Sequence, residues 1–114
     1  MIANLIDKIV LVRSAYLVCY GTLIAYEHVT LKSPYVLNVT LGHSRRILFW
    51  AGAATISELA VSGTAKAGKC KFPAWVPEHV VIDVQEIIPM TPRAIKSLNA
   101  VPIWTEFKEG EQNE

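Results

Sequence analysis

The chain has 114 residues, enough for one domain with a buried core and too few for two. Hydrophobic residues make up 52% of it and charged residues 18%, below the roughly 25% that is usual in soluble domains. A domain this small has a large surface for its volume. We therefore expect either a tight β-rich core or, as the favoured interpretation, apolar surface that is buried against other subunits.

Several classes of protein are disfavoured by composition. No apolar run approaches the roughly 18 residues of a membrane span, and residues 1–12 lack the basic start and the cleavage site of a secretory signal. Cys19 and Cys70 do not have the spacing of a metal or redox motif. The sequence does not decide whether they form a disulfide, and reduced thiols in a cytoplasmic setting are the favoured state.

Charge is unevenly distributed along the chain. The net charge is +1, yet residues 105–114 hold four glutamates and one lysine, which leaves 10 basic and 6 acidic side chains in the rest. That remainder is mildly basic and far from the basic stripe of a specific nucleic-acid-binding protein. We predict a single domain over residues 1–104 and an acidic, polar segment over residues 105–114.

The first half of the chain has the composition of β-strands. Residues 10–26 are rich in β-branched and aromatic side chains but too long for one average strand, so we predict that Gly21 divides them at a bulge or bend. Turns are predicted at residues 27–28 and 32–34. Residues 35–41 alternate between two faces, and a tight turn at residues 42–44 is predicted to join them to a strand over residues 45–50 in a hairpin.

Two short helices are predicted by their terminal residues. Thr55 and Glu58 fit a capping box, and Gly63 suits the position after the last helical residue. Thr91 and Pro92 are the preferred residues for the N-cap and first position of a second helix. Between the helices we expect a long loop over residues 63–79, pinned by aromatic side chains, and one strand over residues 79–90. A last segment, residues 101–104, is predicted to be a short strand or to dock on the body.

These elements predict a fold class. Five or six strands in a mostly antiparallel arrangement, interrupted by two short helices, indicate a small β-rich α+β domain, with an antiparallel sheet or partly open barrel.

Catalytic and metal-binding motifs are missing. The three histidines, His28, His43 and His79, fall at predicted turns or strand edges, without a nucleophile elbow or metal-ligand spacing. Gly52 is not followed by the Gly-Lys-Ser/Thr ending of a phosphate-binding loop. We expect no enzymatic activity, no cofactor and no metal.

The stretch over residues 44–63 is the strongest candidate for a site. Arg45 and Arg46 lie on opposite faces of a strand, so one of them is expected to be exposed, where a guanidinium suits phosphate or carboxylate. The small residues 51–54 lead into a helix start, where free amides favour anions. The alternative is that these residues only permit close strand–helix packing. The candidate anion, ligand or interface residues are Arg45, Arg46, Trp50, Gly52, Thr55, Ser57, Tyr16 and Lys71.

The chain resembles a family of small proteins of unknown function encoded by tailed bacteriophages and prophages. The resemblance covers about residues 10–104 and is carried by residues 45–64, 69–73 and 84–104. The resemblance rests on Arg45, Arg46, Phe49, Trp50, Gly52, Ala53, Ala54, Ser57, Leu59, Ala60, Cys70, Lys71, Phe72, Val101, Pro102 and Trp104. It implies a phage origin and supplies no activity.

Composition and resemblance together predict a non-enzymatic phage protein. The favoured role is a virion-associated capsid or tail accessory subunit that forms homo-oligomers and binds other phage proteins. The alternative is a host-takeover or anti-defence protein that binds a small anionic or nucleotide ligand at an oligomer interface. The expected location is the virion or the host cytoplasm, with no membrane partner and no specific nucleic acid.

Overall fold

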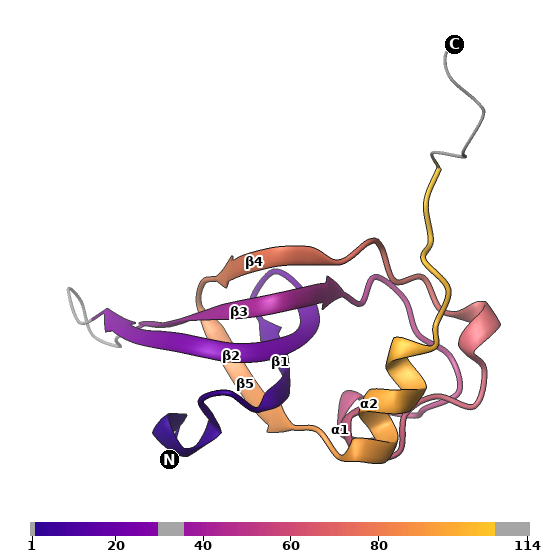
Figure 1. Ribbon diagram of the computed structural model, residues 1–114, viewed down its shortest axis with the longest axis horizontal. Coiled ribbons are helices and arrows are strands. Elements are labelled where there is room, and N and C mark those ends of the chain that lie inside the picture. Colours follow the sequence, from indigo (N-terminus) through magenta and orange to yellow (C-terminus); the bar gives the residue numbers. More distant parts are fainter. Residues whose placement is uncertain (1, 30–35, 107–114) are drawn as a thin grey trace, which may run out of the picture.

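The computed structural model describes residues 2–29 and 36–106. In this part of the chain, β1 (Ile9–Ser14), β2 (Val18–Val29), β3 (Val36–Arg46), β4 (Val76–Val81) and β5 (Val84–Pro89) form one sheet. The strand order is β4-β3-β2-β1-β5, with every neighbouring pair antiparallel (Figure 1). The predicted α+β, β-rich class is confirmed. The turn predicted at residues 32–34 and most of the acidic segment lie outside the described residues.

The sheet curls into a partly open barrel. β4 and β5 are its two edges, yet they follow one another in the chain and only Ile82 and Asp83 separate them, so the edges must approach each other. Asp83 takes a positive φ of 56° at this link, and its amide donates to Asn38 Oδ1 over 3.0 Å. This bond ties the β4–β5 link to β3, although the two edge strands are not paired and the barrel is not closed.

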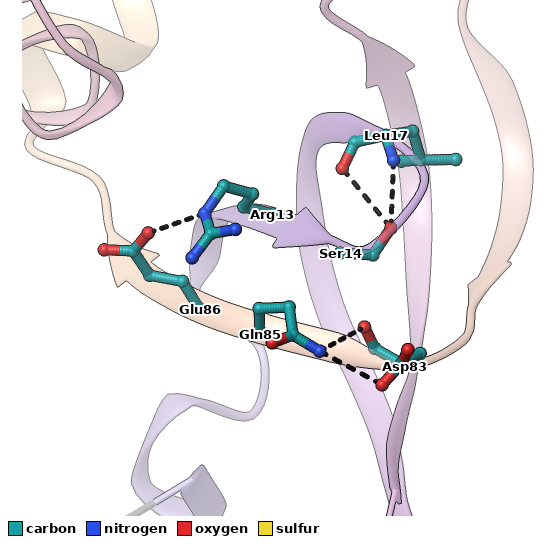
Figure 2. A network of polar contacts seen from close by, with 6 residues as sticks. All are labelled: Arg13, Ser14, Leu17, Asp83, Gln85 and Glu86. Atoms are coloured by element: carbon teal, nitrogen blue, oxygen red, sulfur yellow. Dashed lines mark hydrogen bonds and ion pairs between the residues drawn. The ribbon is translucent and has the colours of Figure 1, made fainter.

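The first break in the strands differs from the prediction. It falls at residues 15–17, where the Ser14 hydroxyl accepts hydrogen bonds from the Tyr16 and Leu17 amides (Figure 2 shows the Leu17 bond). Gly21 does lie at the predicted irregularity, a shift in register between β2 and β3, but it does not divide the strand, since β2 continues through it. A Cβ on Gly21 would lie 3.0 Å from Ser44 Cα, so the glycine permits β2 and β3 to approach closely.

Three other boundaries were predicted wrongly. Residues 27–28 are paired inside β2, and residues 42–44 lie inside a continuous β3. His43 has a φ of 48°, but the residues on either side of it still pair with β4, so this is an irregularity and not a hairpin turn. Conversely, the single strand predicted over residues 79–90 is divided into β4 and β5 by the link at Asp83.

Both helices begin as predicted, and α1 also ends as predicted, before Gly63. α1 (Ile56–Ser62) has Thr55 as its N-cap, and α2 (Pro92–Asn99) has Thr91. Half of the predicted capping box is present: Glu58 N donates to Thr55 Oγ1 over 3.1 Å. The Glu58 carboxylate accepts from the Ala54 amide over 2.7 Å, one residue before the N-cap amide that a capping box uses. Two short 3-10 helices, η1 (Ile2–Leu5) and η2 (Ala67–Lys69), complete the described elements.

Buried side chains form two clusters on the two faces of the sheet. One fills the interior of the barrel and the other lies between the sheet and the helical pair α1–α2. The barrel cluster comprises Val10, Val12, Cys19, Leu23, Val39, Leu41 and Val81. The helix-side cluster comprises Leu11, Tyr20, Ile47, Leu59, Ala60, Cys70, Phe72, Met90, Ala94, Leu98 and Val101.

Candidate functional site

Arg45 lies in the interior and is 1% exposed. Its guanidinium donates to the carbonyl oxygens of Pro73 (3.0 Å), Leu98 (3.2 Å) and Phe72 (3.3 Å). The Phe72 and Trp75 rings lie 5.3 and 5.2 Å from its central carbon, within the range of cation–π contacts. Arg45 therefore joins β3 to α2 and to the loop before β4, and its donors are directed at backbone carbonyls within the protein.

Arg46 is the exposed arginine of the pair, because it points to the opposite face of β3. Its charge lies near His79, whose Nδ1 is 3.2 Å from Ser44 Oγ. Burial, with a smaller contribution from Arg46, lowers the pKa of His79 below its usual value.

Burial also raises the pKa of the Cys19 thiol to about 11, against smaller opposing effects of Ser44 and Arg46. A thiol with this pKa stays protonated near neutral pH and is a poor nucleophile.

The small residues at the start of α1 are explained by packing. Gly52 has a φ of 85°, and a Cβ there would lie 2.5 Å from Thr64 Oγ1 and 2.7 Å from the Ala65 amide nitrogen. The Thr64 hydroxyl donates to the Ala51 carbonyl, and the Ala65 amide donates to the Gly52 carbonyl over 3.4 Å. A pocket of about 180 Å³ beside this corner is lined by Glu58 as well as Arg93. A carboxylate in the lining opposes an anion, so the geometry favours close packing.

The other predicted residues do not converge on one site. Trp50 is half-buried and its Nε1 donates to the Ala53 carbonyl over 3.1 Å. Thr55 is occupied as the N-cap, and Ser57 is exposed on α1. Tyr16 is 72% exposed in the β1–β2 turn.

Lys71 belongs to a different feature, which we name the outer ribbon: residues 48–49, 71–72 and 103–104. Phe49 pairs with Lys71 in an antiparallel bridge, and Phe72 pairs with Ile103 in a parallel one. Lys71 N donates to the Phe49 carbonyl over 2.8 Å, and Trp104 N donates to the Phe72 carbonyl over 2.9 Å. Three segments that are distant in sequence therefore lie side by side, and the predicted docking of residues 101–104 occurs here.

The outer ribbon presents one basic and several apolar side chains to solvent. The Lys71 ammonium lies 5.6 Å from the centre of the Trp104 ring. Because Phe49 pairs with Lys71 across the bridge and Phe72 is buried, Phe49 is placed on the same outer face as Lys71. The large exposed apolar side chains of the ribbon are Leu48 (55%), Phe49 (51%), Ile103 (51%) and Trp104 (41%). The sequence motifs contain Phe49, Lys71 and Trp104 but do not indicate that they meet.

A second hollow lies at the open side of the barrel. It has a volume of about 260 Å³ and is lined by η1, the start of β3 and β5. Nearby, Arg13 and Glu86 form an exposed ion pair of 3.0 Å, and the Gln85 side chain bonds Asp83 (Figure 2). Exposed pairs of this kind contribute little to stability. The residues lining the hollow are Ile2, Leu5, Leu37, Val84, Gln85, Glu86 and Ile87.

The described His, Cys, Asp and Glu side chains do not form a metal site, and the two cysteines are not paired. Within residues 2–29 and 36–106, no group of three His, Cys, Asp or Glu side chains could hold a metal ion. Cys19 and Cys70 are both buried as free thiols, so the disulfide left open by the sequence is not formed. No helix in the same ranges is long and apolar enough to cross a membrane.

Fold and site define a small, partly open β-barrel with a helical pair on one side and a mixed apolar and basic ribbon on its surface. Residues 7–98 match the family described as a domain of unknown function, DUF6948, and the chain belongs to that family. No curated protein and no solved structure is significantly similar to the chain. The match includes Phe49 and Lys71 of the outer ribbon and ends before Trp104.

Proposed function

We propose that this protein is a non-enzymatic assembly subunit, which binds copies of itself and other proteins through the outer ribbon. The exposed apolar side chains at residues 48, 49, 103 and 104 support the proposal, because they are 41–55% exposed in segments that the bridges bring side by side. Of these, Phe49 shares the face of Lys71, and the Trp104 ring lies against the Lys71 ammonium. Contiguous apolar patches that include aromatic residues are typical of protein interfaces. Such an interface accounts for the high apolar content of a chain this small.

The biological setting of the proposal is a bacteriophage. It rests on the sequence resemblance to small proteins of tailed phages, with a virion-associated capsid or tail accessory role as the favoured setting. Mass spectrometry of purified virions of a phage that encodes the protein tests this directly. Stoichiometric recovery is expected, and repeated absence from virions would leave only a role in the host cytoplasm.

Sedimentation equilibrium of the purified chain tests the proposed interface. We expect an oligomer at micromolar concentration, and we expect the Phe49→Ser, Trp104→Ser double variant to associate at least tenfold more weakly, since each change removes an exposed aromatic contact. Tyr16→Ser is the matched control, because Tyr16 is an exposed aromatic residue outside the ribbon and its loss should leave association unchanged. A wild-type chain that stays monomeric at all concentrations would contradict self-association.

The second candidate is binding of a small anionic ligand, such as a nucleotide. The contact between the Lys71 ammonium and the Trp104 ring supports it, because an ammonium beside exposed aromatic rings suits a phosphate attached to a flat base. The test is calorimetric titration with ATP and GTP, comparing wild type with Lys71→Gln. Arg45 is unsuitable for mutation in this test, since its loss would disturb the fold.

A further inference from the structure

The charged side chains next to the outer ribbon restrict what can cover it. Lys71 is on the ribbon, while Lys66 and Lys69 precede it in the same loop and are also exposed. The sequence has no acidic residue between Glu58 and Glu78. An apolar surface that carries Lys71, with two further lysines in the same loop, is complementary to a partner with both apolar and acidic side chains.

A twofold dimer through the ribbon does not meet this requirement. In such a dimer the same surface occurs on both sides and supplies no acidic side chain from residues 48–49, 71–72 or 103–104. Where the axis passes close to Lys71, the two Lys71 side chains also approach each other. Like charges that are brought together in a desolvated contact lower the affinity at least several-fold. A different and acidic partner surface avoids this repulsion and complements the lysines.

The chain itself contains a segment with this chemistry. Residues 105–114 hold Glu106, Glu109, Glu111 and Glu114 against a single lysine, and they include Phe107. Resting on the proposed assembly function, we propose that this acidic segment of one copy binds the outer ribbon of a neighbouring copy. Ten extended residues span up to about 33 Å, more than the width of three adjacent segments, which is about 10 Å.

The direction of the chain favours a neighbouring copy as the recipient. Residues 102–106 are exposed, and Figure 1 shows this stretch running away from α2 and from the sheet. Each copy then has one donor segment and one acceptor ribbon. This head-to-tail contact builds a ring where the rotation closes and a filament where it does not.

A mixing experiment with full-length chains tests the proposal. The acceptor variant is Lys71→Glu, with Lys69→Glu as a second acceptor variant should the first not fold. The donor variant is Glu109→Gln, Glu111→Gln, Glu114→Gln. In sedimentation velocity at low salt, we expect each variant alone to self-associate at least roughly tenfold more weakly than wild type. An equimolar mixture should form a 1:1 heterodimer, because the acceptor variant keeps an intact acidic segment and the donor variant keeps an intact ribbon. Lys96→Glu, at an exposed lysine on α2, is the matched control and should associate like wild type.

The outcomes separate this proposal from the general one. Variants that oligomerise like wild type would overturn the acidic-segment contact and leave the assembly function standing. Variants that stay monomeric on mixing would also overturn it, since they would indicate a twofold contact or a segment that binds its own chain. A monomeric wild type would contradict both proposals. Support requires, in addition, that the heterodimer weakens in 1 M salt, where the Debye length falls to about 3 Å.

Discussion

At the scale of single residues, Arg45 and Arg46 are adjacent in sequence, but one side chain is buried and the other is exposed. Arg45 places a guanidinium in the interior, where a charge is unfavourable unless its donors are bonded. The carbonyls of residues 72, 73 and 98 accept those bonds, and two aromatic rings lie against the group. Its neighbour Arg46 points to the opposite face and is exposed. The two arginines therefore differ in function although they are adjacent.

The first prediction compares these arginines. Arg45→Leu should lower the free energy of unfolding by about 3 kcal/mol or more, because it leaves three carbonyl oxygens without their donor in the interior. Arg46→Leu should change it by no more than about 0.5 kcal/mol, as is usual at exposed positions. Urea denaturation followed by circular dichroism measures both. Equal losses for the two variants would refute the structural role of Arg45.

At the scale of elements, the two helices are short and depend on their ends and on packing. α1 has 7 residues and α2 has 8, too few to be stable alone in water. Threonine N-caps satisfy amides at both starts, and Leu59, Ala60, Ala94 and Leu98 bury one side of the pair. The corner before α1 is held against residues 64–66 by Gly52, which takes a conformation that favours glycine.

The second prediction concerns this corner. Gly52→Ala should destabilise the protein by about 2 kcal/mol or more, because a Cβ would add backbone strain at positive φ and clash with Thr64 and Lys66. Gly68→Ala is the control, since nothing lies within 4 Å of the added Cβ and stability should change by less than about 1 kcal/mol. Thermal unfolding of both variants provides the measurement. A tolerated Gly52→Ala would show that the corner is loosely packed.

At the scale of the whole molecule, the sheet separates two cores. Cys19 and Tyr20 are adjacent in β2, so their side chains point to opposite faces, Cys19 into the barrel and Tyr20 toward the helices. Both are almost fully buried, at 0% and 1% exposed. Burial raises the pKa of Cys19 from 9.0 to about 11 and that of Tyr20 from 10.0 to about 12, in each case against smaller opposing effects of nearby groups. Each core therefore contains a group whose protonated form is favoured by burial.

The third prediction is a loss of stability in alkali. A raised folded-state pKa means that the unfolded chain releases its proton first. The stabilisation is therefore complete below pH 9 and falls as the pH rises through 11 for Cys19 and 12 for Tyr20. Each group should account for about 2 to 3 kcal/mol of this loss. Urea midpoints measured from pH 8 to 11 test the sign, and Cys19→Ala should flatten the dependence. Stability that rises over this range would contradict the assignment.

The sequence by itself determined the features that depend on neighbours within three or four residues. Both helix starts followed from their capping residues, since a cap is completed by amides of the same turn. The β-rich α+β class followed from the alternating and β-branched stretches. That Arg45 and Arg46 occupy opposite faces also followed from the two-residue repeat of a strand.

Only the tertiary structure decided the features that depend on distant partners. The break at residues 15–17, the continuous pairing of β3 through His43 and the division at Asp83 all depend on which strands pair, and pairing joins residues far apart in the chain. For the same reason, the two-residue repeat did not reveal which arginine faces the interior. The outer ribbon forms because bridges link residue 49 to residue 71 and residue 72 to residue 103, and only those long-range bonds bring Phe49, Lys71 and Trp104 to one surface.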